Sequence, residues 1–378
     1  MQICNALVHT LNQGFVKKDI YIENGVFVDD VRIGDNEILD AAGCYLIPGL
    51  VDVHFHGCAG YDFSDATEEA LERIGEYELS NGVTSICPAS MTLPEDRLDK
   101  ICRNALKYAT SDSNVRARLC GVHLEGPFVS MEKKGAQNPQ YIKKPDIEMF
   151  ERLQEAAGGL IKLITLAPEL DGAEAFIKNL SGKVHISVGH TMADYSTSSA
   201  AFEMGADHVT HMYNAMPPVN HRESGVVGAA FDNSHVMTEL ICDGIHISAP
   251  VIRMTFSMFG ADRIVLISDS MMATGMDDGE YSLGGLSVKV RGNLATLKDG
   301  VIAGSATNLM DCMKKAVSIG IPLEDVVKCA SYNPARSIGM GNSIGSIDVG
   351  KKADCVLLSA VDLSIKAVIL DGEVVRKE

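Results

Sequence analysis

The chain has 378 residues, 46% of them hydrophobic, and a formal net charge of -17 at pH 7, so its length allows one large α/β barrel or two ordinary domains. The acidic excess argues against nucleic acid or an anionic membrane surface as a partner, because both are bound through clustered lysine and arginine. The ten cysteines form no C-x-x-C pair, no stretch has the roughly 18 apolar residues of a spanning helix, and the first residues lack the basic region of a secretory signal, so we expect reduced thiols in a soluble, cytoplasmic protein.

Short β-type runs alternate with turns in residues 1–47. The run Asp19 to Glu23 is followed by Asn24-Gly25, which is a strong hairpin signal. Residues 345–378 show the same pattern. We therefore expect residues 1–47 and 345–378 to form one small accessory β-sandwich beside a larger domain of residues 48–344.

Apolar strand-like runs alternate with helix-like intervals, such as the amphipathic segment Glu68 to Leu79, in the middle of the chain. The runs span Leu50 to His56, Ser85 to Ala89, Leu119 to Glu125, Ile161 to Ala167, Val184 to Val188, His208 to His211, Met237 to Cys242 and Ile264 to Ser268. Parallel strands covered by helices have this pattern of apolar runs, and eight of them suit a closed (β/α)8, TIM-like barrel. The alternative, a doubly wound open sheet, needs a Gly-rich phosphate fingerprint after the first strand, which is not present. We interpret residues 276–297 as an insertion after the eighth strand.

Polar side chains stand at the C-terminal ends of these strands, on the rim where barrel enzymes build their active sites. They are His54, His56, Glu125, His190, His211 and Asp269. Because side chains alternate along a strand, His54 and His56 can point the same way into the barrel mouth. A lone histidine is more often a structural residue than a ligand, but four imidazoles and two carboxylates on one rim are costly to desolvate without a cation.

Imidazole and carboxylate ligands suit zinc or iron, and an incomplete protein shell leaves a position for water, which indicates a catalytic site. Metal lowers the pKa of bound water and gives hydroxide as a nucleophile. Asp269 can accept the proton as general base and pass it to a leaving nitrogen. Its alternative role is a helix N-cap.

Several segments make the chain similar to a known family. The segment Pro48 to Gly57, Pro-Gly-Leu-Val-Asp-Val-His-Phe-His-Gly, resembles the first-strand signature of the amidohydrolase superfamily, and the β-rich ends resemble its accessory sandwich. The segments His123 to Phe128, Lys133 to Ala136 and His211 to Met216 resemble the N-acetylglucosamine-6-phosphate deacetylases within it. The resemblance implies that metal-activated hydroxide hydrolyses the acetamido group of N-acetylglucosamine 6-phosphate to acetate and glucosamine 6-phosphate.

The resemblance also implies metal and base roles for individual residues. Glu125, His190 and His211 match the ligands of the principal metal. His54 and His56 complete a second site, with Glu125 able to bridge, so we expect one or two divalent ions per chain, with zinc favoured over iron or another ion. Asp269 matches the general base.

The residues that match the family's sugar-phosphate contacts are Asn214, Ala215, Arg222 and His246. One or more of them is expected from the neighbouring subunit of a homodimer. Arg222 suits this role because a guanidinium pairs bidentately with phosphate. We interpret Lys133 and Lys134 as a solvated loop edge.

Gln137 departs from the family pattern, since many relatives carry histidine after Lys-Lys-Gly-Ala. That histidine is expected to contact the substrate and to help polarise the acetyl carbonyl, whereas a glutamine amide donates a hydrogen bond but cannot become cationic. We hypothesise that a second metal at His54 and His56 takes over this polarisation. N-acetylgalactosamine 6-phosphate stays an alternative substrate.

Other amidohydrolases, such as a cyclic amidase or an N-acyl amino acid deacylase, are the nearest alternatives. Many of them bridge two metals with a carboxylated lysine at the end of the fourth strand, but Lys162 lies at the beginning of that run here. Glu125 is the better bridge, which favours the sugar deacetylase. A non-catalytic scaffold predicts eroded ligands, whereas every expected ligand and the base are present.

Overall fold

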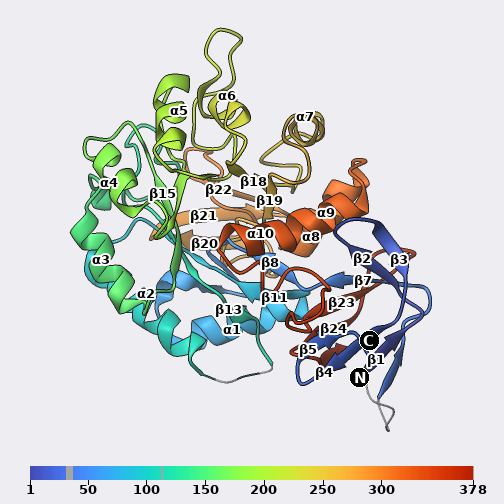
Figure 1. Ribbon diagram of the computed structural model, residues 1–378. Coiled ribbons are helices and arrows are strands. Elements are labelled where there is room, and N and C mark those ends of the chain that lie inside the picture. Colours follow the sequence, from blue (N-terminus) through green and yellow to red (C-terminus); the bar gives the residue numbers. More distant parts are fainter. Residues whose placement is uncertain (31–36, 112, 114, 378) are drawn as a thin grey trace.

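The structure, a computed structural model, describes residues 1–30, 37–111, 113 and 115–377 (Figure 1). Parallel strands surrounded by helices occupy the middle of the chain, and both chain ends lie together in a small β domain. The expected TIM-like barrel with a terminal β domain is therefore confirmed. Two parts of the expected sandwich segments, residues 31–36 and 378, lie outside the described residues.

The barrel strands coincide with the apolar runs that the sequence shows. They are β8 Leu50–Asp52, β11 Val83–Ile86, β14 Val122–Glu125, β15 Ile161–Leu166, β16 His185–Val188, β17 His208–Val209, β18 Met237–Ile241 and β19 Ile264–Ile267. They pair in parallel within two sheets, one of β13 (Arg118–Leu119), β11 and β8, and one of β12 (Ala89–Ser90) followed by β14 to β19 in order. Their C-terminal ends therefore meet at one mouth of the barrel.

Backbone hydrogen bonds beyond the ends of β8 and β19 close the barrel at this mouth. The Asp269 N–H donates to the His54 carbonyl at 2.9 Å, and the His56 N–H donates to the Ser270 carbonyl at 2.7 Å. The closure brings the histidines that follow the first strand next to the aspartate that follows the last one.

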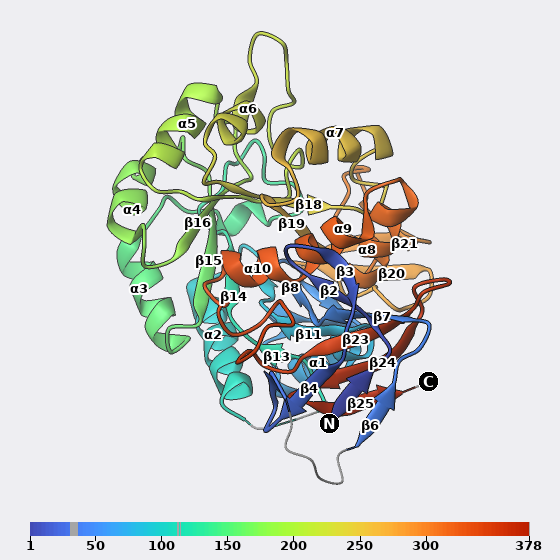
Figure 2. The same cartoon turned by 45° about the vertical axis from the view of Figure 1, so that its right-hand side comes forward.

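Helices cover the outside of the barrel, and Figure 2 shows α3, α4 and α5 following one another along one flank. The helices are α1 Glu68–Ser80, α2 Glu95–Ala109, α3 Ile147–Ala156, α4 Ala173–Leu180, α5 Tyr195–Glu203, α6 Gly225–Asp232, α7 Ala249–Phe259, α8 Leu309–Ser318, α9 Leu323–Ala330 and α10 Tyr332–Ser337, with 3-10 turns at Phe63–Asp65 and Pro139–Tyr141. The expected helix over Glu68 to Leu79 is α1, which begins after Thr67, whose side chain accepts the Ala70 N–H as an N-cap. Within the described ranges, none of the helices combines the length and apolar character needed to cross a bilayer.

The small β domain consists of two sheets, with strand orders β5-β4-β1-β6 and β25-β24-β23-β7-β2-β3. Its strands are β1 Gln2–Cys4, β2 Leu7–Thr10, β3 Gly14–Lys17, β4 Ile20–Glu23, β5 Val26–Val28, β6 Ile38–Asp40, β7 Cys44–Pro48, β23 Cys355–Ser359, β24 Ile365–Leu370 and β25 Glu373–Lys377. Residues of both sheets, such as Ile22 and Leu357, share one buried core, and β7 pairs with β23, so the two chain ends form one unit. The expected hairpin turn joins β4 to β5, with positive φ at Asn24 (52°) and Gly25 (76°). The boundaries at 47/48 and 344/345 stay a prediction.

The segment after β19 forms a three-stranded antiparallel sheet of β20 (Gly279–Leu283), β21 (Leu286–Arg291) and β22 (Leu294–Leu297). This sheet lies where the sequence indicates an insertion. Leu283 shares a buried cluster with Met91 and Met271, and Met91 belongs to the connection that follows β12. The sheet therefore packs against the barrel mouth and forms one wall there.

Candidate metal-dependent active site

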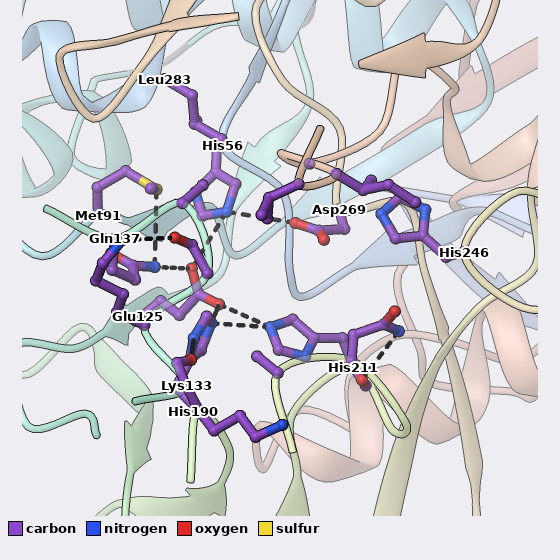
Figure 3. A pocket seen from close by; sticks show the side chains of 18 of the residues that line it. His56, Met91, Glu125, Lys133, Gln137, His190, His211, His246, Asp269 and Leu283 are labelled. Carbon is purple, nitrogen blue, oxygen red and sulfur yellow. Dashed lines mark hydrogen bonds and ion pairs between the residues drawn. The ribbon is translucent and has the colours of Figure 1, made fainter. Parts of the chain in front are cut away.

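A cavity of about 510 Å³ opens at the mouth of the barrel (Figure 3). Most of the site residues expected from the sequence line it: His56, Glu125, Gln137, His190, His211, Asn214, Ala215, His246 and Asp269. His54 lies beneath them and is fully buried. Arg222 does not line this cavity, because it lies on an exposed loop where its N–H donates to the Asn220 side chain.

Glu125, at the end of β14, is the centre of the first group of potential metal ligands. Its Oε1 lies 2.9 Å from His190 Nε2 and 3.0 Å from His211 Nε2, and these two ring nitrogens lie 3.1 Å from each other. Three donor atoms thus converge on one point, as ligands of a single ion must.

His54, His56 and the same Glu125 form a second group. His56 Nε2 lies 3.3 Å from Glu125 Oε2 and 3.3 Å from Asp269 Oδ1, while His54 Nε2 lies 3.4 Å from Glu125 Oε1. Among the described residues, the buried His54 Nε2 has no hydrogen-bond partner. An unpaired buried nitrogen surrounded by carboxylates is costly, so the donor set fits a bound cation.

The electrostatics of the mouth also favour positive charge between these side chains. Burial opposes protonation of His56, but the neighbouring Asp269 and Glu125 raise its pKa to about 10. Burial likewise opposes ionisation of Glu125, yet His54 and His190 hold its pKa well below the usual range. The same carboxylates would stabilise a divalent ion bound between these side chains.

The outer nitrogens of two imidazoles are fixed by the protein. His56 Nδ1 lies 3.1 Å from the Ala89 carbonyl, and His190 Nδ1 lies 2.8 Å from the Lys133 carbonyl. Since a carbonyl can only accept, a proton belongs on Nδ1, and Nε2 faces the cluster, where its lone pair is available to a metal in the neutral ring. The rings are therefore oriented as metal ligands require.

Asp269 follows β19 and is 7% exposed, with its carboxylate facing His56 in the cavity (Figure 3). It has a positive φ of 49°, as do His190 (47°) and His211 (24°). Non-glycine residues in this strained region cluster at functional sites. The described chain after Asp269 forms turns and then β20, not a helix, so the N-cap alternative is wrong.

The loop that contains Gln137 supports the cluster from one side. Gln137 Nε2 donates to Glu125 Oε2 at 2.7 Å, and its Oε1 accepts the Thr92 N–H at 2.6 Å. The amide thus fixes the carboxylate that both ligand groups share, and its direct contact with substrate stays a prediction. Lys133 and Lys134 line the cavity with half-buried side chains, which differs from the solvated loop edge we expected.

Sequence reasoning missed one member of the site, Glu239 on β18. This carboxylate is fully buried, and its Oε2 lies 2.8 Å from His54 Nδ1 and 3.0 Å from the His211 backbone nitrogen. The available signal is an acidic residue inside the mostly apolar run Met237 to Cys242. A buried carboxylate needs partners of this kind.

Comparison with known proteins agrees with this geometry. The amidohydrolase family model matches residues 45–375. The N-acetylglucosamine-6-phosphate deacetylase of Bacillus subtilis is 39% identical, covering 89% of this chain and 86% of the relative, and the N-acetylgalactosamine-6-phosphate deacetylase of Escherichia coli O157:H7 is 31% identical, covering 87% of each. A mutant N-acetyl-D-glucosamine-6-phosphate deacetylase from Mycobacterium smegmatis, solved in complex with N-acetyl-D-glucosamine-6-phosphate, superposes with a TM-score of 0.92 at 31% identity over 99% of both chains.

The chain therefore belongs to the amidohydrolase family and, within it, to the N-acetylglucosamine-6-phosphate deacetylase group. Its buried histidine and glutamate clusters are consistent with the divalent-metal binding that the donor set indicates.

Proposed function

We propose that the protein hydrolyses the acetamido group of N-acetylglucosamine 6-phosphate to acetate and glucosamine 6-phosphate. One observation carries the proposal: a single cavity whose floor brings Glu125, four histidines and Asp269 together. The substrate of the Bacillus subtilis relative and the sugar bound by the mycobacterial relative support the choice of amino sugar.

The proposed cofactor is one or two divalent ions, with zinc as the first candidate. Glu125, His190 and His211 would hold the principal ion, and His54 and His56 would hold a second one together with Glu125. A bound ion supplies Lewis-acid activation of water and of a carbonyl oxygen. The second ion would compensate for Gln137, whose neutral amide already donates to Glu125.

Asp269 is the proposed general base. Burial raises the pKa of its carboxyl, but His56 and His54 outweigh burial and hold the pKa below the usual value. The group is therefore an anion at neutral pH, facing the cavity and able to accept the proton of the attacking water. The same carboxyl then gives this proton to the amine nitrogen as the carbon–nitrogen bond breaks.

The sugar phosphate is proposed to lie between Asn214, Ala215 and His246 at the cavity wall. His246 Nδ1 lies 2.7 Å from Asp243 Oδ2, and although burial opposes protonation, this carboxylate raises the pKa of the imidazole. A protonated imidazole suits an anionic ligand. Arg222, exposed and outside its own cavity, is proposed to reach the cavity of the partner in a homodimer.

An Arg222→Ala variant is expected to raise KM for the phosphorylated sugar by roughly 10- to 100-fold, the cost of a lost charge-assisted pair, with little change in zinc content. Mixed dimers of Arg222→Ala and Asp269→Asn chains should regain activity, because one of their two sites carries both native residues. Steady-state kinetics on the mixed and separate variants checks this. Mixtures with no gain over the separate variants would place Arg222 outside a shared site.

The activity itself is tested by acetate release from the zinc-loaded protein. N-acetylglucosamine 6-phosphate, its galacto isomer and unphosphorylated N-acetylglucosamine are compared in parallel. We expect strong preference for the phosphorylated gluco isomer. Preference for the galacto isomer would support the alternative that the Escherichia coli relative represents. No release from any of the three would move the assignment to a cyclic amidase or an amino acid deacylase.

A further inference from the structure

Glu239 lies beneath the two ligand groups and has no role in the proposed reaction. It stands in the middle of β18, is fully buried and does not line the cavity. Its Oε2 accepts hydrogen bonds from His54 Nδ1 at 2.8 Å and from the His211 backbone N–H at 3.0 Å, and its Oε1 lies 3.5 Å from His208 Nε2. One carboxylate oxygen therefore contacts one member of each ligand group.

The contact with His54 sets the protonation of its ring. A carboxylate at 2.8 Å requires a proton on Nδ1, so in the neutral imidazole the lone pair is on Nε2. That Nε2 faces Glu125 Oε1 at 3.4 Å and, among the described residues, has no hydrogen-bond partner. An anionic partner behind an imidazole also increases the basicity of the nitrogen that faces the metal.

The contact with His211 fixes a main-chain conformation. His211 has a φ of 24°, which non-glycine residues rarely adopt, and its N–H is paired with Glu239. This conformation directs the ring so that Nε2 lies 3.0 Å from Glu125 Oε1. Without the carboxylate, a buried N–H would lose its acceptor and the ring would lose its fixed direction.

We propose that Glu239 is a positioning residue that couples the two metal sites, because a single oxygen orients His54 in one and His211 in the other. The inference rests on the proposed metal-dependent function. We therefore expect a change at Glu239 to weaken both metal-binding steps together, although this side chain lies outside the cavity.

The test compares zinc binding by the wild-type chain, Glu239→Gln and the control Ser187→Ala. Ser187 is also buried inside the barrel, but its hydroxyl bonds Thr210 at 2.6 Å and no proposed ligand. Each metal-free chain is titrated with zinc against a competing chelator, and zinc per chain is measured by elemental analysis. We expect Glu239→Gln to weaken both binding steps by roughly 10- to 100-fold, because a neutral amide oxygen accepts the two N–H groups more weakly than a carboxylate does, and Ser187→Ala to bind like wild type.

Unchanged zinc affinity in Glu239→Gln, or weakening of one step alone, would overturn the coupling. A wild-type chain that binds a single ion would overturn it too, since there would be no second site to couple. Failure of the proposed function looks different: the wild-type chain would bind no zinc and release no acetate.

A second measurement uses the wild-type chain alone, so it tests the proposal even if the Glu239→Gln variant fails to fold. Nitrogen-15 spectra of the histidines in the zinc-loaded protein report which ring nitrogen carries the proton, and the His54 signals are those missing from a His54→Asn spectrum. We expect His54 with a protonated Nδ1 and an unprotonated Nε2. The reverse tautomer would remove Glu239 from the proposed role.

Discussion

An Asp269→Asn variant should release acetate roughly 10²- to 10⁴-fold more slowly than wild type, the range that general acid–base catalysis contributes, with KM and zinc content little changed. Asparagine keeps the size and the hydrogen-bonding oxygen of Asp269, but its amide cannot accept the proton of the attacking water. The carboxylate faces His56 at 3.3 Å from the cavity side, so it touches the ligand group without completing either set of three donors. Turnover, KM and zinc per chain are measured on the same preparations.

The control for this variant is Asp277→Asn, which changes an exposed aspartate in the same connection between β19 and β20, outside the cavity. It should behave like wild type. Near-normal turnover in Asp269→Asn would remove Asp269 from proton transfer. Loss of zinc in parallel with activity would assign the residue to metal binding instead.

The fold could be predicted from sequence because hydrophobic period and composition differ between the ends and the middle of the chain. Parallel strands buried on both faces leave largely apolar runs, and these occur at most of the barrel strands, although the run His208 to His211 at β17 is mostly polar. The strand ends were less predictable: β8 stops at Asp52 and β17 at Val209, although the runs continue to His56 and His211. Hydrophobic periodicity does not indicate where a strand stops pairing with its neighbours in the sheet. The chain after β17 leaves the sheet in this way at His211, which has a positive φ.

The ligand candidates could be found because a barrel places the residues after its strands on one rim. Glu239 was not among the predicted site residues because it lies within a strand, below the rim. The contact between Gln137 and Glu125 depends on how a loop folds back over 12 residues, which no local pattern specifies. Arg222 lies on an exposed loop outside the cavity, which the spacing of the motif around it does not specify.

A Glu125→Gln variant is the second change for which we expect a very large effect: loss of most bound zinc, with acetate release falling to background. Glu125 is the one residue shared by both groups of ligands that face the cavity, and its carboxylate lies within 3.4 Å of His54, His56, His190 and His211. A neutral amide removes the negative charge that offsets a divalent cation among four buried imidazoles. Zinc per chain and acetate release are measured after identical zinc loading.

The matched control is Glu132→Gln, another carboxylate of the cavity wall, whose Oε2 accepts the Ser130 hydroxyl at 2.9 Å. It should retain zinc and turnover, because its charge lies outside both ligand groups. If Glu125→Gln kept a full complement of zinc, metal binding would not depend on the charge of Glu125, and Glu125 would no longer be the proposed bridge. Reduced turnover with only one ion lost would instead restrict Glu125 to one site, because a ligand common to both cannot be neutralised without weakening both.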